Sequence, residues 1–204
     1  MTELFDNMAD DETIETVRNA LMNNGIEVIV AGNGKEALEK LIDLIPEGSD
    51  VGEATSTTLD QIGATEHFQN SGKYNSTRKR LQGIENPEER ADVRRHMISP
   101  EFGIGSVQAI TEKGQVTIAS ATGSQLAPYV YGAKRVIWVA GTNKIVKSLD
   151  DAFKRIYEHC LPLESERVKK AYNMQKSVVN KILIFEKERQ GRITLILVKE
   201  KLGF

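Results

Sequence analysis

The chain has 204 residues, 40% of them hydrophobic, and carries 27 Lys and Arg against 29 Asp and Glu, a net charge of -2. This length suffices for one domain with a sizeable core, and the single cysteine, Cys160, excludes a disulfide framework and any cysteine-only zinc or iron–sulfur centre. The near balance of charge gives no electrostatic case for binding nucleic acid or an anionic membrane surface.

No apolar run reaches the roughly 20 residues of a membrane span. Residues 1–12 are acidic and lack the regions of a signal peptide. We therefore expect a cytoplasmic protein with a flexible acidic N-terminus over 1–12 and a single domain over 13–204.

Helices and strands alternate through the first half of the chain. Apolar residues at helical spacing begin at Thr13, and the Asn and Gly residues at 23–25 favour the left-handed conformation that ends a helix. Asn33 is typical of a helix N-cap, because Glu36 follows three residues later. The pattern predicts helices over 13–23 and 34–45, one ending near 63 and one over 87–98, strands over 26–31 and 50–54, and an irregular excursion with one weak helix over 64–86.

The second half of the chain contains the densest strand pattern. Residues 136–140 are apolar at every position, which is typical of a central parallel strand covered by helices on both faces. A turn over 188–191 between two apolar runs predicts a C-terminal β-hairpin. The pattern predicts strands over 102–106, 107–111, 115–119, 136–140, 181–185 and 192–198, and helices over 124–131, from 148 onward and over 164–172. The expected fold is α/β, a mainly parallel sheet flanked by helices on both faces, with a C-terminal β-hairpin.

Three polar turns follow strands of the predicted sheet, at residues 54–58, 120–124 and 141–144. Ligands of open α/β sheets usually lie beyond the carboxyl ends of the strands. Hydroxyls, an amide and an ammonium at that edge can hold a phosphate or a carboxylate. We therefore predict a site for a small anionic metabolite. Its candidate residues are Ser56, Thr57, Thr58, Gly123, Ser124, Asn143 and Lys144, of which Gly123 allows close backbone approach.

Each candidate also has a purely structural explanation. Ser and Thr before a helix are ordinary caps, worth about 1 kcal/mol whether or not a ligand exists. Lys144 is compatible with a solvated surface lysine. Glu112, in the tight turn 112–114, is either a polar turn residue or a catalytic nucleophile or base. The histidines lack metal-ligand spacing, so no metal site is expected. The sequence leaves the cofactor unknown.

Four ordered blocks resemble the LUD family of lactate-utilisation-domain proteins. Residues 51–63, VGEATSTTLDQIG, resemble the family pattern VGxGxSxTLxEIG. Residues 105–114, 119–126 and 136–146 add three further blocks, and the last of these ends in GTNKIV. The segment from 191 to 204 resembles the closing hairpin of the family, so the resemblance spans roughly residues 10–204.

The resemblance implies a fold like that of ribose-phosphate isomerases, glucosamine-phosphate deaminases and CoA transferases. It implies a role in lactate or related organic-acid utilisation, as an accessory or subunit beside iron–sulfur partner proteins. The ligand would then be a carboxylate, a sugar phosphate or a CoA ester. An alternative is an acyl or CoA transferase, or a sugar-phosphate isomerase, that uses Glu112, by analogy with the Glu-x-Gly nucleophile of CoA transferases. Ser56, Thr58, Gly123, Asn143 and Lys144 fall on motif positions of the family.

Two departures from the family pattern affect these expectations. Glu53-Ala54 replaces a glycine-rich loop, which puts a carboxylate beside the expected anion site unless Glu53 turns away. Residues 171–180 lack the cysteine cluster that many family members carry, so the chain is not expected to hold its own iron–sulfur cluster. The sequence leaves open whether the protein is an enzyme and whether it forms a homodimer.

Overall fold

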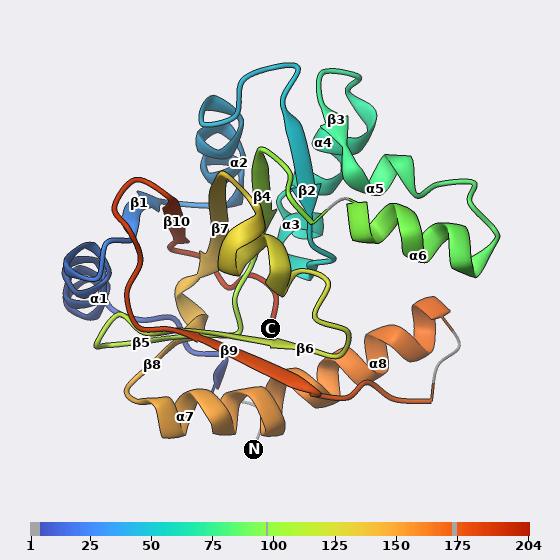
Figure 1. Cartoon of the computed structure of the whole chain (residues 1–204). Helices are drawn as coiled ribbons and strands as arrows, with labels where there is room; N and C mark the ends of the chain where they lie inside the picture. Colours follow the sequence, from blue (N-terminus) through green and yellow to red (C-terminus); the bar gives the residue numbers. More distant parts are fainter. Residues whose placement is uncertain (1–4, 97, 173–174) are drawn as a thin grey trace.

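The computed structural model describes residues 5–96, 98–172 and 175–204 and has a six-stranded sheet at its centre (Figure 1). The strand order is β1-β10-β7-β4-β2-β3, and every neighbouring pair is parallel. The mainly parallel α/β fold is therefore confirmed. The strands of this sheet are β1 Glu27–Ala31, β2 Asp50–Glu53, β3 Asn75–Ser76, β4 Phe102–Gly105, β7 Arg135–Gly141 and β10 Ile193–Val198.

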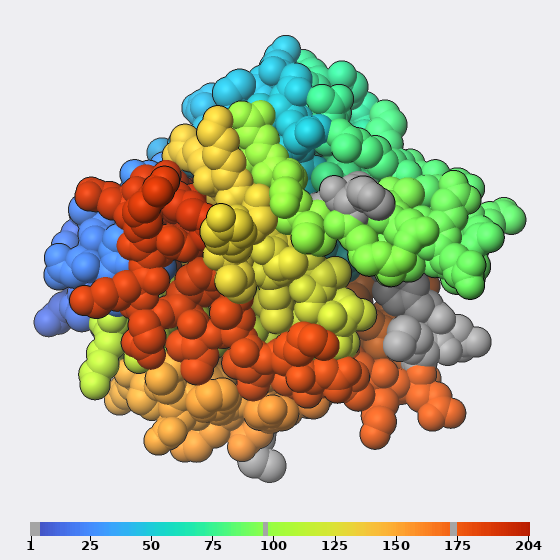
Figure 2. All heavy atoms as spheres, viewed as in Figure 1, coloured from blue at the N-terminus to red at the C-terminus, as the bar shows by residue number. Residues whose placement is uncertain are grey.

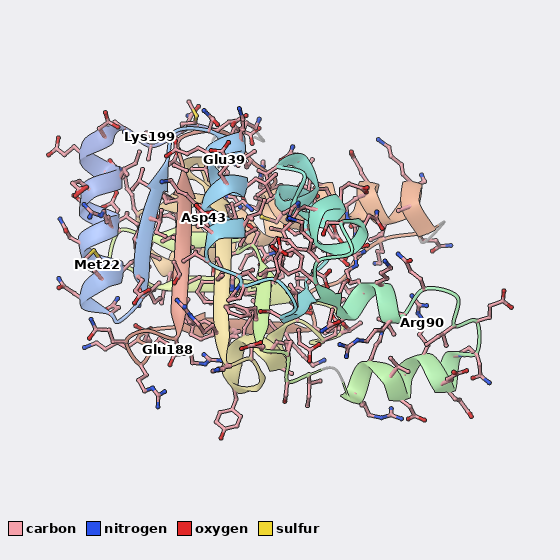
Figure 3. The ribbon with its side chains drawn as sticks, turned by 90° about the horizontal axis from the view of Figure 1, so that it is seen from above. Met22, Glu39, Asp43, Arg90, Glu188 and Lys199 are labelled. Carbon is pink, nitrogen blue, oxygen red and sulfur yellow. The ribbon has the colours of Figure 1, made fainter. Side chains whose placement is uncertain are left out.

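The central strands are apolar on both sides because both sheet faces are covered. Trp138 and Leu195 pack with helix α1 (Asp11–Asn23) on one face, whereas their neighbours Val139 and Ile196 pack with helices on the other. That second face is covered by α2 Gly34–Asp43, α3 Thr57–Gln61 and α4 Ala64–Asn70. From above, α1 with Met22 lies beside β1, and α6 with Arg90 projects at the opposite end of the sheet (Figure 3).

A second, four-stranded sheet shares the face of α1. Its order is β8-β5-β6-β9, with β5 and β8 parallel and the other two pairs antiparallel. Val116 and Phe185 of this sheet join the apolar cluster around Trp138. The strands are β5 Ala109–Thr111, β6 Val116–Ser120, β8 Ile145–Val146 and β9 Lys181–Phe185.

The predicted C-terminal hairpin is wrong. Its first strand, β9, pairs with β6 in the small sheet, whereas its second strand, β10, lies between β1 and β7 at the centre of the large sheet. Figure 2 shows the red segment that contains β9 lying across the front of the molecule. The physical reason is burial: all six residues of β10 are buried, which an exposed hairpin strand would not allow.

The remaining helices surround the two sheets. The predicted single weak helix over 64–86 is wrong, since α4 and α5 both form there with β3 between them. The helix predicted over 124–131 is confirmed in part: the chain is helical over 126–132, mostly as a π-type segment at Pro128–Gly132. The other helical segments are α5 Thr77–Arg80, α6 Pro87–His96, the 3₁₀ turn Thr142–Lys144, α7 Leu149–Lys154, the π-type segment Arg155–Cys160 and α8 Leu161–Tyr172.

Several described residues of the segment 1–12 contact the body of the protein, among them Ala9, which packs on the apolar cluster around Trp138, and Asp11, which pairs with Lys199. Phe5 packs with buried apolar side chains of the small sheet and α7. Asp6 Oδ1 lies 3.4 Å from Nε2 of buried His159, and its other oxygen lies 2.8 Å from Lys201 Nζ. The division into residues 1–12 and 13–204 stays a prediction. Within the described residues, no helix combines the length and the apolar character needed to cross a bilayer.

Candidate functional site

A cavity of about 150 Å³ lies beyond the carboxyl ends of β2, β4 and β7. It is closed on other sides by β6, by the end of the π-type segment and by α8, and we call it the Lys144 cavity. This is the edge at which parallel sheets usually bind ligands. Its lining residues are 54–58, 106–108, 118–121, Gln125, Lys144, Ile156, 160–161, Glu164, Arg167, 177–179 and Phe204.

Lys144 occupies the 3₁₀ turn directly after β7, and only 2% of its surface is exposed. Its Nζ donates hydrogen bonds to Thr58 Oγ1 at 3.0 Å and to Ser106 Oγ at 2.9 Å. Both partners are neutral hydroxyls that also line the cavity. Among the described residues, no carboxylate forms an ion pair with this amine. A buried ammonium without an opposite charge is costly, so the site favours an added anion.

Burial and, to a smaller extent, the positive charge of Arg155 lower the pKa of Lys144 to about 7, with Cys160 acting in the opposite direction. Desolvation disfavours the charged form of an amine. The amine is therefore divided between its protonated and neutral forms near neutral pH. An anion in the cavity would stabilise the protonated form.

The hydroxyl-rich turn after β2 provides one wall of the cavity. Ser56 is the N-cap of α3 and accepts a hydrogen bond of 3.3 Å from the Leu59 N–H, so it has the ordinary capping role of a serine before a helix. Thr58 is 1% exposed and accepts from Lys144. Thr55 and Thr57 line the same cavity. The turn therefore combines a capping role with a row of hydroxyls at the cavity.

Glu53 turns away from the cavity. Its carboxylate accepts hydrogen bonds from Ser76 Oγ at 2.5 Å and from Thr77 Oγ1 at 3.3 Å, and only 7% of the residue is exposed. The backbone N–H of Arg78 adds a third contact at 3.4 Å. These partners hold the carboxylate between β2 and α5, so the departure from the family pattern places no negative charge at Lys144.

The structure brings together only part of the predicted site. Ser56, Thr57, Thr58 and Lys144 line the cavity. The second turn follows β6, which belongs to the small sheet, so the expectation of three turns on one sheet is wrong. Ser120 and Gln125 of that region reach the cavity, and Gly123 and Ser124 lie outside its lining.

Four predicted residues take other positions. Gly123 has φ +88° and donates its N–H to Ser120 Oγ at 2.8 Å, while Ser124 is exposed. Asn143 is buried, and its Oδ1 accepts from the Leu202 N–H at 3.2 Å. Glu112 lies half-buried in the turn between β5 and β6, outside the cavity lining.

Residues 203–204 close the cavity near the amine. Gly203 has φ +60°, and a Cβ at this position would lie 2.3 Å from Thr58 Oγ1 and 3.2 Å from Lys144 Nζ. Its N–H donates to Gln61 Oε1 at 2.6 Å, and Phe204 joins the lining. The backbone thus approaches the Thr58–Lys144 pair as closely as only glycine permits.

Ser106 and a buried Arg–Cys pair were not predicted as parts of the site. Arg155 is fully buried and donates from Nη1 to Cys160 Sγ at 3.0 Å and to the Gln108 carbonyl. Burial raises the pKa of the Cys160 thiol, while Arg155 and Lys144 lower it. Arg155 is a charged residue next to Lys154 in a helical run, and arginines are rarely fully buried, so its sequence position gave no signal of burial. Among the described residues, no group of three or more His, Cys, Asp or Glu side chains is arranged to hold a metal ion.

Comparison with known proteins identifies a family and a fold. The model of the LUD domain matches residues 14–203. No curated protein matches the sequence. A DUF162 family protein from Deinococcus radiodurans matches with a TM-score of 0.57 and 8% identity, over 94% of this chain and 99% of that chain. At this identity the likeness concerns the fold alone.

Two weaker likenesses involve eIF2B proteins from Chaetomium thermophilum. The structure of eIF2B delta matches with a TM-score of 0.36 and 16% identity, over 71% of this chain and 58% of that chain. A chain of the tetrameric eIF2B-beta2-delta2 complex matches with a TM-score of 0.42 and 15% identity, over 91% and 59%. These two likenesses carry no functional conclusion.

Proposed function

The chain belongs to the LUD domain family, and we propose that it binds a small anionic metabolite in the Lys144 cavity. One observation carries this proposal: a buried amine borders a cavity, and its hydrogen-bond partners in the described part of the chain are two hydroxyls, Thr58 and Ser106. An anion with a free oxygen would supply the missing opposite charge, and charge-assisted hydrogen bonds are the strong ones.

The size and lining of the cavity favour a short organic acid or a phosphate ester. A volume of about 150 Å³ is small compared with a whole CoA ester. The hydroxyls of Ser56, Thr57 and Thr58 face one part of the cavity, and Ile118 and Val179 supply apolar surface. In this proposal Lys144 and the hydroxyls hold the anion, while Gly123, Ser124 and Asn143 support the loops around it. Acyl transfer through Glu112 receives no support from the position of that residue.

Family membership extends the proposal to the utilisation of lactate or a related organic acid in the cytoplasm, beside iron–sulfur partner proteins. An exposed apolar group supports a protein partner: Tyr131 is 89% exposed, Val130 51% and Ile98 45%. Gly132 lies against the Ile98 carbonyl, which keeps these residues together. Copurification of iron–sulfur proteins with the wild-type chain, reduced by Tyr131→Ala, would support this role. Unchanged copurification with that variant would contradict the assignment of this surface.

Ligand protection in thermal unfolding tests anion binding. The panel contains short carboxylates, 2-oxo acids, sugar phosphates, inorganic phosphate, CoA and acyl-CoAs. A ligand at 100 times its Kd adds about 2.7 kcal/mol to the free energy of unfolding, which raises Tm measurably. We expect one anion class to protect the wild type and Lys147→Met, whose lysine is exposed, and to leave Lys144→Met unprotected. Equal protection of Lys144→Met would contradict the proposal.

A further inference from the structure

We propose that Lys144 forms a Schiff base with a small carboxylate that carries an aldehyde or ketone carbon, which makes 2-oxo acids the ligand class of the cavity. This inference rests on the proposed function, because the cavity must first bind the acid. It adds a covalent step that anion binding alone does not require. The chemistry needs an accessible neutral amine, nearby groups that transfer protons, and room for the acid.

The position of the amine meets the first requirement. Lys144 is the only lysine among the described residues that line the cavity. No carboxylate of the described chain pairs with it, so no carboxylate charge holds the proton on the nitrogen. Arg155, buried nearby, adds a positive charge that also disfavours the ammonium. Desolvation beside another cation is a known way to make a lysine nucleophilic.

Two hydroxyls are placed to move protons. Thr58 Oγ1 and Ser106 Oγ lie 3.0 and 2.9 Å from Nζ, and both line the cavity. A hydroxyl is at once a donor and an acceptor, so each can take a proton from the nitrogen and return one to an oxygen. Thr58 lies in the first turn of α3 and Ser106 directly follows β4, and the two hydroxyls hold the amine between them.

The proposed step balances with the loss of one water. The lone pair of neutral Nζ attacks the carbonyl carbon, a C–N bond forms, and the carbonyl π electrons move to oxygen. A proton passes from nitrogen to that oxygen through Thr58 or Ser106, which gives a carbinolamine. A second proton then passes from the nitrogen to the carbinolamine oxygen, and the nitrogen lone pair forms the C=N bond as the C–O bond breaks and water leaves. The acid's carboxylate would face the hydroxyls of Thr55 and Thr57.

Borohydride trapping tests this step. Wild-type protein is incubated with glyoxylate or pyruvate, reduced with sodium borohydride, digested and mapped by mass spectrometry. Borohydride delivers hydride to the imine carbon and leaves a stable secondary amine on the lysine. We expect the modification on the peptide that contains Lys144, and its loss in Lys144→Met but not in Lys147→Met. Glycolate, which has a carboxylate but no aldehyde or ketone carbon, should give no adduct.

The outcomes separate this inference from the proposed function. If a 2-oxo acid protects the wild type in thermal unfolding but gives no adduct on Lys144, the Schiff base is wrong and anion binding stands. Adducts spread over exposed lysines at the level found on Lys144 would also overturn it. Mapping on the wild type decides the question even if Lys144→Met is unstable. If no anion protects and no adduct forms, both proposals fail.

Discussion

Lys144 Nζ donates a hydrogen bond of 3.0 Å to Thr58 Oγ1, which joins the end of β7 to helix α3 across 86 positions of the sequence. Among the described residues, both hydrogen-bond partners of the amine are hydroxyls, although it is buried. A fold that required only a link between these two elements could use a neutral pair at lower desolvation cost. This desolvation cost is the reason for proposing an anion at the amine.

Replacing Lys144 should change how stability depends on pH. The unfolded lysine keeps its proton up to about pH 10.5, whereas the folded lysine releases it near pH 7. Between these values the unfolded state binds more protons, so the free energy of unfolding rises with pH by up to about 1.4 kcal/mol per pH unit. We expect this rise in the wild type and its absence in Lys144→Met, measured by urea denaturation from pH 7 upward. Identical pH profiles of the two proteins would show that the amine keeps its ordinary pKa.

Comparing Ser56→Ala with Ser148→Ala distinguishes the capping role of Ser56 from a contact between Ser56 and the anion. Both serines are N-caps, with Oγ accepting from Leu59 N at 3.3 Å and from Asp151 N at 3.2 Å. Each substitution should therefore lower the free energy of unfolding by about 1 kcal/mol. Only Ser56 lines the cavity, so only Ser56→Ala should weaken anion binding in a titration at a temperature where both variants are folded. Equal anion affinity in the two variants would leave Ser56 as a cap.

Gly203→Ala should disturb the site more than its backbone strain explains. Gly203 and Gly191 both have positive φ, so alanine at either position costs about 1–2 kcal/mol. A Cβ at 203 also meets Thr58 Oγ1 at 2.3 Å, whereas a Cβ at 191 meets no atom within 4 Å. We expect Gly203→Ala to lower both Tm and anion affinity, and Gly191→Ala to lower Tm alone. Unchanged affinity in Gly203→Ala would mean that the anion does not depend on the Thr58–Lys144 pair.

Glu53→Gln should affect stability and leave binding unchanged. The buried carboxylate accepts from Ser76 and Thr77, and the amide that replaces it keeps only one acceptor oxygen. The expected loss is about 1–3 kcal/mol in the free energy of unfolding. Because the carboxylate points away from the cavity, the anion Kd should stay within about twofold, less than 0.5 kcal/mol. A clear increase in affinity would place the negative charge of Glu53 within reach of the ligand.

The sequence predicts which segments form buried strands better than it predicts which strands pair with one another. Continuous apolar residues identify β7 as a central strand, and the same rule applied to Ile193–Val198 identifies β10. The hairpin was predicted instead because β9 and β10 are close in sequence and flank a glycine turn. Local patterns of that kind do not show which sheet a strand joins, since pairing depends on distant partners such as β6.

Part of the site could be predicted from the general rule that ligands bind beyond the carboxyl ends of parallel strands. The turns after β2 and β7 contain Ser56, Thr58 and Lys144 at the carboxyl edge of one sheet, where the general rule for ligand sites applies. Ser106 and Phe204 reach the cavity only through tertiary packing, and no local motif distinguishes them. Burial of Lys144 follows from the approach of residue 203, which residues 141–144 alone do not reveal.

Proton uptake on anion binding tests the central role of Lys144 most directly. Calorimetric titrations use an anion that protects the wild type and has no aldehyde or ketone group. They are carried out near pH 8 in two buffers that differ in ionisation enthalpy. Because the free amine is mostly neutral above pH 7, binding an anion to its ammonium form should take up about one proton per anion. We expect this uptake in the wild type and in Lys147→Met, and none in Lys144→Met. Binding without proton uptake in the wild type, or equal uptake in Lys144→Met, would contradict an anion site at Lys144.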